Sequence, residues 1–408
     1  MSGLLHRLGV FCVRHRYPIL ALWLVAAVVL IVLAGRSGSN THNNLYLPGT
    51  NSQEASDLLD ERFPSEANFT TPIVLAASSG KLTDQKNEAA IQQTVAALQR
   101  DSLVREAVSP LGPEGANALS KNEKIGYIPL TLTVGQDKLT DEEAESILKL
   151  ADPARAAGLQ VAGGGYLGEQ VSQPSTDDSV AVGLVAAMIV LFIAFGSIVA
   201  MGMPIVTALV GLGGALSIIA LLANITEIPN VAPTLATMIG LGVGIDYSLF
   251  IVSRHRAQLN RGMRVTESIP EAIATSGKAV VFAGATVVIA LCSLALARIS
   301  IVTTLGYTAG IAVAIAVLAA LTLLPALLAI VGERINSLRL PTGRRALRHP
   351  HKPPGWARWA RSVANHPWRA ITIALGVLIL LALPALSLRL GQRDDGQLQK
   401  STTARQAY

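Results

Sequence analysis

The stretch GLGVGIDYSLFIVSRHR, Gly240 to Arg256, places an aspartate and a tyrosine side by side within a run that is otherwise apolar. The apolar residues extend back to position 231, so the run exceeds the length of about 20 residues that a helix needs to cross a bilayer. A charged acid at the centre of such a helix costs at least ~2.5 kcal/mol on insertion scales, and intramembrane acids are usually functional. Asp246 is therefore the first candidate for a functional residue.

The composition indicates a membrane protein. Hydrophobic residues make up 51% of the 408 residues and charged residues only 15%, which is too apolar for an ordinary soluble chain. The net charge of +6 comes from basic residues beside apolar segments, and aromatic residues are 4%, so nucleic-acid binding is not expected. Cys12 and Cys292 lie near or within apolar segments, and they predict neither a disulfide framework nor a metal site.

Seven segments are predicted to span the membrane, and they cover residues 18–34, 179–195, 199–223, 231–253, 279–297, 303–331 and 370–388. Lys and Arg are concentrated before the first segment, between the fourth and fifth, and between the sixth and seventh. Because basic loops stay in the cytoplasm, the N-terminus is predicted to be cytoplasmic. The large polar region and the end of the chain are then outside the membrane of a multi-pass protein.

An internal repeat favours a retained first helix over the alternative of a cleavable signal peptide. The sequence RHRYPILALWLVAAVVLIVLAG is echoed near the end by ANHPWRAITIALGVLILLALPALSLRLG, and Pro18 corresponds to Pro367. Such similarity at a large period indicates a duplicated unit.

The sequence divides into six predicted parts. They are a cytoplasmic N-terminus with the first span (1–35), an extracytoplasmic domain (36–178), a bundle of five spans (179–332), a basic linker (333–369), a seventh span (370–390) and the start of a second outer domain (391–408).

The region outside alternates strand and helix patterns. Strands are predicted at residues 71–78, 103–109, 124–133 and 159–165, and amphipathic helices at 84–101 and 140–158. Thr140 and Glu143 form a predicted capping box for the second helix. The order βαββαβ is typical of the ferredoxin-like, or split βαβ, arrangement.

The residues around Asp246 predict a proton relay. In a helix Asp246 shares a face with Gly242, whereas Tyr247 lies above Gly244 and Gly240, and these three glycines are predicted to let a neighbouring helix approach closely. An unpaired carboxylate in an apolar setting favours the protonated form, so Asp246 is expected to bind and release a proton. The Tyr247 hydroxyl is expected to donate to it or orient it. The alternative to a proton relay is a structural role, in which Asp246 forms a hydrogen bond that only holds two helices together.

A nucleotide site is not expected. The glycines lie inside a spanning segment instead of following a strand of a soluble sheet. The sequence ATSGKAV lacks the first glycine of a phosphate-binding loop, because Ala272 stands in its place.

The motif GLGVGIDYSLFIVSRHR, with EAIATSGKAVVFAGATVVI and LGYTAGIAVAIAVLAALTLLPALLAIVGERI further along, resembles the mycobacterial membrane protein large (MmpL) family of the resistance, nodulation and division (RND) superfamily. The resemblance covers the whole chain. It implies a transporter of the inner (plasma) membrane and not an enzyme: an exporter of lipids or other hydrophobic cargo that uses a proton gradient and no cofactor. By the same resemblance, Asp246 and Tyr247 would form the proton relay. The outer region would be a porter domain with a ferredoxin-like fold.

Family members have two such halves, and this chain resembles one of them. The resemblance therefore implies half of an exporter, with a complementary second half or a homo-oligomer as partner, and the chain alone is expected not to transport. Two alternatives remain: a non-transporting accessory, regulatory or decayed fragment, and a sterol-sensing receptor of similar shape. No appended signalling domain supports the receptor.

Overall fold

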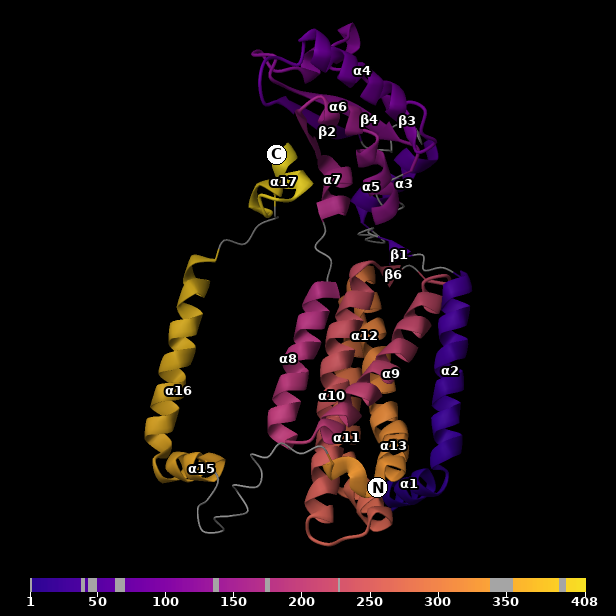
Figure 1. The fold of residues 1–408 in the computed structure, drawn as a ribbon, viewed down its shortest axis with the longest axis vertical. Helices are drawn as coiled ribbons and strands as arrows, with labels where there is room; N and C mark the ends of the chain where they lie inside the picture. The colour runs from indigo at the N-terminus through magenta and orange to yellow at the C-terminus, as the bar shows by residue number, and fades with distance from the viewer. Residues whose placement is uncertain are drawn as a thin grey trace. The chain divides into compact units, whose positions relative to one another are not determined.

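A computed structural model describes residues 2–37, 41–42, 50–62, 70–134, 139–172, 177–226, 228–337, 355–388 and 394–408. The described chain is mostly helical, with one four-stranded and one two-stranded sheet (Figure 1). It divides into two compact units, residues 1–338 together with 398–408, and residues 339–397.

A four-stranded antiparallel sheet forms the core of residues 70–163. Its strands are β2 (Thr70–Ala77), β3 (Val104–Ala107), β4 (Ile125–Leu132) and β5 (Leu159–Gly163), in the order β3-β4-β2-β5. The helices are α4 (Gln85–Leu98), α5 (Asp141–Lys149) and α6 (Asp152–Ala156). The observed element order agrees with the predicted βαββαβ order, except that the second helix is divided. Pro153 accounts for the division, since it lacks the N–H that would continue the helix.

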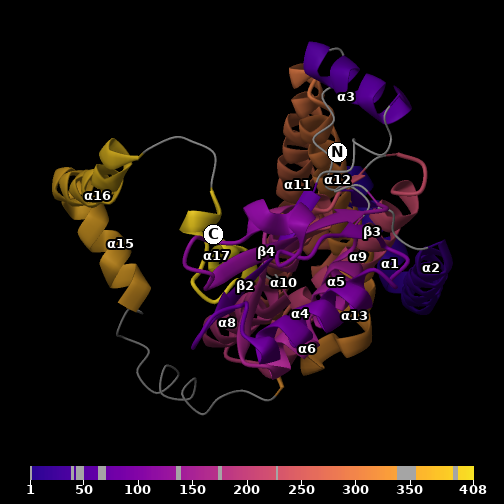
Figure 2. The same cartoon turned by 90° about the horizontal axis from the view of Figure 1, so that it is seen from above.

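Alternating side chains of the central strands build the core of this sheet. Ile73 and Leu75 of β2 and Ile128 and Leu130 of β4 are fully buried, and they form one cluster with apolar residues of α4, α5 and α6. Figure 2 shows α4 and α6 along one side of the sheet. This period of two is what a sheet covered on one face requires.

The predicted capping box is confirmed. Thr140 Oγ1 accepts a hydrogen bond from the Glu143 N–H at 3.3 Å, and the Glu143 carboxylate accepts one from the Thr140 N–H at 3.0 Å. Two donors at the start of α5 are thereby satisfied.

The C-terminal residues pack on the same sheet unit. The short helix α17 (Thr403–Ala407) lies against α7 (Gly165–Ser172) and β5. Thr403 Oγ1 accepts a hydrogen bond from the Gly163 N–H at 2.7 Å, and Ser172 Oγ accepts one from the Ala404 N–H at 3.0 Å. The sequence interpretation did not predict α7. It could not predict the contact with α17, because that contact joins residues more than 200 positions apart.

Helices make up most of the rest of the first unit. They are α1 (Ser2–Arg14), α2 (Arg16–Ser37), α8 (Asp177–Phe195), α9 (Ile198–Leu222), α10 (Val231–Leu259), α11 (Val265–Cys292), α12 (Ser300–Leu318) and α13 (Leu324–Val331). A further helix, α3 (Asn51–Arg62), precedes the sheet, and a two-residue parallel pairing joins β1 (Thr41–His42) to β6 (Ile228–Pro229). The second unit contains α15 (Gly355–Asn365) and α16 (Pro367–Ala382).

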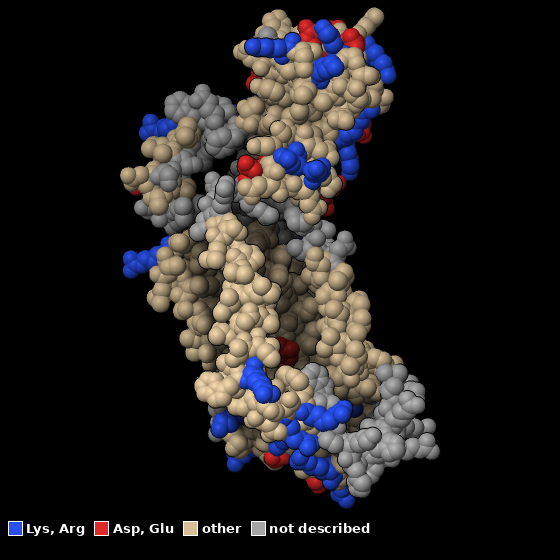
Figure 3. All heavy atoms as spheres, turned by 90° about the vertical axis from the view of Figure 1, so that its left-hand side faces the viewer, with Lys and Arg blue, Asp and Glu red and all other residues tan. Residues whose placement is uncertain are grey.

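Six helices in the described residues are long and apolar enough to cross a membrane: Arg16–Ser37, Ile198–Leu222, Val231–Leu259, Val265–Ala297, Ser300–Asn336 and Pro367–Ser387. They correspond to six of the seven predicted segments. The remaining segment lies in α8, whose apolar part, Ser179–Phe195, is shorter than the other six. On the face that Figure 3 shows, the middle of the helices carries few charged side chains, and Lys and Arg gather at their lower end, as expected for helices that cross a membrane.

The sixth predicted span is interrupted near Pro325. Residues Ala319–Leu323 form one π-helical turn, in which the Leu324 N–H donates to the Ala319 carbonyl. Pro325 has no N–H to donate to the carbonyl four residues earlier, which is that of Leu321. Prolines and π-helical turns are both common places for a helix to kink. The Cys12 thiol donates a weak bond to that carbonyl at 3.9 Å.

Candidate functional site

Asp246 lies near the middle of α10, and its side chain is exposed. Among the described residues it has no hydrogen bond and no ion pair. The predicted bond from the Tyr247 hydroxyl is absent from these contacts, because successive helix residues point about 100° apart. The carboxylate therefore lies on a face of α10 that no described helix covers.

Tyr247 points instead into the bundle, where it is 7% exposed. It belongs to a cluster with apolar residues of α11 and of the π-helical turn, including Val280 and Ala320. Its ring lies over Gly284 of α11, where a Cβ atom would be 3.5 Å from Tyr247 Cε2 and would overlap Cγ2 of Val317. Tyr247 thus fixes the rotation of α10 and leaves Asp246 on the open side.

Two of the three candidate glycines lie at close helix contacts. A Cβ atom on Gly240 would be 3.2 Å from the Cβ of Ala312 in α12, and one on Gly244 would be 3.1 Å from the Cβ of Ala208 in α9. Gly242 has no neighbouring atom within 4 Å of such a Cβ. It lies on the open face, one turn before Asp246.

The basic end of α10 does more than set topology. Arg256 donates to the Phe195 carbonyl at 3.0 Å and to Asn336 Oδ1 at 3.0 Å, so it ties α10 to the end of α8 and to the 3-10 helix Gly332–Asn336 that follows α13. His255 is fully buried, with its Nδ1 2.8 Å from the hydroxyl of Ser268 in α11. The sequence interpretation missed both residues and Gly284, since a basic cluster beside a span and a glycine in a span have ordinary explanations.

Comparison with known proteins identifies relatives along nearly the whole chain. The family model described as MMPL family matches residues 44–370. Membrane protein YdfJ of Bacillus subtilis is 33% identical over 100% of this chain and 55% of its own length. The mycolic acid-containing lipids exporter MmpL11 of Mycolicibacterium smegmatis is 28% identical over 94% of this chain and 41% of its own length. The trehalose monomycolate exporter MmpL3 of Mycobacterium tuberculosis is 24% identical over 90% of this chain and 42% of its own length.

The chain spans about half the length of these curated relatives. The matched relatives that carry a functional name are described as transport proteins: some as exporters, and one from Mycobacterium tuberculosis as a heme uptake protein.

Proposed function

This chain belongs to the MMPL family, and on that premise we propose that it takes part in moving lipids or other hydrophobic molecules across the plasma membrane in exchange for protons. Its helices make it a multi-pass membrane protein. The export of mycolic acid-containing lipids and of trehalose monomycolate by relatives supports a lipid as cargo.

The proposal rests on Asp246, an uncovered carboxylate midway along a spanning helix. When it is ionised, this group needs a polar partner or water, and when it is protonated it tolerates an apolar neighbour. Proton binding at Asp246 therefore decides whether the open face of α10 packs more favourably against a polar or an apolar neighbour. Such a difference between the two protonation states can drive a conformational transition. Tyr247 transmits the movement, because it ties α10 to α11 and to the π-helical turn.

Energies limit what one proton can do. Exposing an acyl chain of about 16 carbons to water costs about 12 kcal/mol, at roughly 0.8 kcal/mol per CH₂ group. A charge that crosses 100 mV releases only about 2.3 kcal/mol. The proton cycle must therefore move helices while the cargo stays sheltered, and we assign that shelter to the sheet unit, as a ferredoxin-like porter domain outside the membrane.

The open face of Asp246 requires a partner in the functional assembly. We propose that a complementary half or a second copy of this chain supplies a polar group there, since an ionised acid in the membrane is otherwise too costly.

The test is transport of a fluorescent NBD-labelled phospholipid under an imposed pH gradient, in proteoliposomes that hold this chain either alone or with a complementary half. Dithionite quenching reports the location of the labelled lipid. Asp246→Asn keeps the shape but cannot ionise, so it is expected to remove the part of transport that depends on the gradient. Ser253→Ala is the matched control, because Ser253 is an exposed polar residue two turns further along α10. Gradient-driven transport by Asp246→Asn at the wild-type rate would exclude the relay, and movement independent of the gradient in every variant would exclude proton coupling altogether.

A further inference from the structure

Ser248 of α10 carries a buried hydroxyl that its own helix does not use. The residue is fully buried, and its Oγ atom has no hydrogen-bond partner among the described residues. The other buried Ser and Thr side chains within the described spanning helices are all bonded, and they are those of Thr207, Ser217, Ser268 and Thr308. An unsatisfied buried hydroxyl is destabilising, and native structures rarely retain one. Ser248 therefore indicates a binding partner inside the bundle.

The register between α10 and α12 shows what Ser248 faces on one side. Cβ atoms on Gly240 and Gly244 would be 3.2 Å and 3.7 Å from the Cβ atoms of Ala312 and Ala316 in α12, respectively. A step of four residues along α10 thus matches a step of four along α12. One turn further, Ser248 lies opposite Ala320, which is fully buried in the π-helical turn.

The register with α9 runs the other way. The same two Cβ atoms would be 3.5 Å from Leu212 Cδ1 and 3.1 Å from Ala208 Cβ, respectively. One turn further, Ser248 lies opposite Pro204, which is inside α9. Proline has no N–H for the carbonyl four residues earlier, here that of the fully buried Ala200. Because a helical carbonyl points toward the residue four positions later, the Ala200 oxygen is directed toward the level of Ser248.

The Ala320 carbonyl has likewise lost its helical donors. The N–H four residues later, that of Leu324, donates to the Ala319 carbonyl instead. The residue five positions later is Pro325, which has no N–H. Two carbonyl acceptors, of Ala200 and Ala320, therefore lie at the level of one unsatisfied hydroxyl.

The other polar groups freed in the π-helical turn are bonded from the side of α1 and α2. The Cys12 thiol donates to the Leu321 carbonyl at 3.9 Å, and Trp23 Nε1 donates to Thr322 Oγ1 at 3.0 Å. These donors account for that side of the turn, and Ala320 belongs to the side that faces α10.

We propose that Ser248, with the carbonyls of Ala200 and Ala320, binds one water molecule between α9, α10 and the π-helical turn. The Ser248 hydroxyl donates to the water oxygen, and the water donates its two hydrogens to the two carbonyls. Three partners are the usual number for a buried water, and ordered waters satisfy backbone groups that prolines free in membrane helices. The water joins α10 to both proline-containing helices without direct contact, so α10 can shift against them while each group keeps a bond.

The chemistry of the site favours water over a metal cation. Its three oxygens are neutral. Asp246 lies on the open face of α10, about 200° around the helix from Ser248, so its carboxylate does not reach the site. A cation buried among three neutral oxygens would lose more hydration than they replace.

The first test is solid-state NMR of the full-length wild-type chain in liposomes, with magnetisation transferred from water protons to serine Cβ atoms. Ser248→Ala assigns the Ser248 signal. In the wild type, this signal should receive magnetisation from water, whereas that of Ser217, which is buried and bonded to its own helix, should receive much less. Equal, weak transfer to both serines would overturn the proposal without reference to stability.

Stability separates a bridged hydroxyl from an unpaired one. In an SDS titration of the detergent-solubilised chain, Ser248→Ala should raise the unfolding equilibrium constant about tenfold relative to Ser217→Ala, because the water loses its donor. Ser217→Ala is the matched control, since it removes a buried helical hydroxyl and brings the same gain in helix propensity. Removing a truly unpaired hydroxyl would instead stabilise the protein. Equal effects of the two changes, or stabilisation by Ser248→Ala, would therefore overturn the proposal.

The same titration in sodium chloride and in choline chloride distinguishes the two possible occupants. A water site predicts equal stability of the wild type in the two salts. A stabilisation by sodium that Ser248→Ala removes would assign the site to the cation, and the water proposal would be wrong.

Discussion

Gly284→Ala tests the contact that holds Tyr247 in the bundle. In an isolated helix this change would stabilise by about 1 kcal/mol, the difference in helix propensity. Here the new Cβ overlaps Cγ2 of Val317 and also touches the Tyr247 ring. Valine has one strongly preferred χ1 rotamer in a helix, so its methyl group cannot turn away, and overpacking of this kind costs about 1–3 kcal/mol.

Gly242→Ala is the matched control, because it adds the same methyl group where no atom lies within 4 Å. The free energies of unfolding of the two variants should therefore differ by about 1–3 kcal/mol, with Gly284→Ala the less stable. Adding Val317→Ala should relieve the overlap, so the double variant should show a favourable coupling energy of similar size.

The assay is unfolding of the detergent-solubilised protein by SDS, followed by a fluorogenic thiol reagent. Cys12 is fully buried in the folded state, so its reaction reports unfolding, and Cys292→Ser removes the second thiol. Equal stability of Gly284→Ala and Gly242→Ala would refute this account of α11 packing, and so would a double-mutant cycle without coupling.

The remaining predictions concern packing, titration and topology. Gly244→Ala should be less stable than Gly242→Ala by about 1 kcal/mol in the same SDS titration; the reverse order would contradict close packing on that face. Burial raises the pKa of the Cys12 thiol from 9.0 to about 11, so its contribution to stability is complete below pH 9.0 and is lost as the pH rises toward 11; Cys12→Ala should lack this loss. A cysteine at Ser79 should react with a membrane-impermeant maleimide in intact cells, and one at Ser337 should not; the opposite pattern would invert the predicted orientation.

Local patterns were sufficient to predict most elements of this chain. The strands around Ile73 and Ile128 alternate with a period of two, and the capping box of Thr140 and Glu143 is encoded within four residues. The apolar runs of six spans are continuous in sequence. These features depend on neighbours along the chain, and so they could be predicted without knowledge of the fold.

The tertiary structure decided the features that depend on distant neighbours. The sequence predicts that Asp246 and Tyr247 act together in one proton relay. In the structure Tyr247 packs against Gly284 inside the bundle, and Asp246 lies on an open face. Helical periodicity assigns residues to faces, but it does not tell which face another helix will cover. The same holds for Gly242, which has no close neighbour although Gly240 and Gly244 do.

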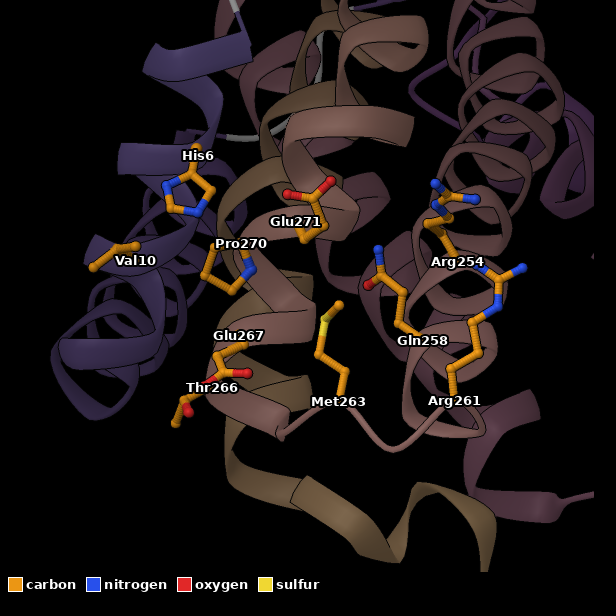
Figure 4. Close-up of a pocket in the computed structure, with 10 residues that line it drawn as sticks. All are labelled: His6, Val10, Arg254, Gln258, Arg261, Met263, Thr266, Glu267, Pro270 and Glu271. Carbon is orange, nitrogen blue, oxygen red and sulfur yellow. The ribbon is translucent and has the colours of Figure 1, made fainter.

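A cavity at the turn between α10 and α11, which Arg254, Arg261, Glu267 and Glu271 line (Figure 4), shows the same limit on a larger scale. Its arginines were correctly recognised as a basic loop beside a span, which is a property of the sequence alone. The sequence could not show that Gln258 is buried between them and two glutamates of the next helix, under a helix that begins at Ser2. The sequence determines which charged residues the chain contains. Only the folded chain determines which of these residues lie close enough to interact.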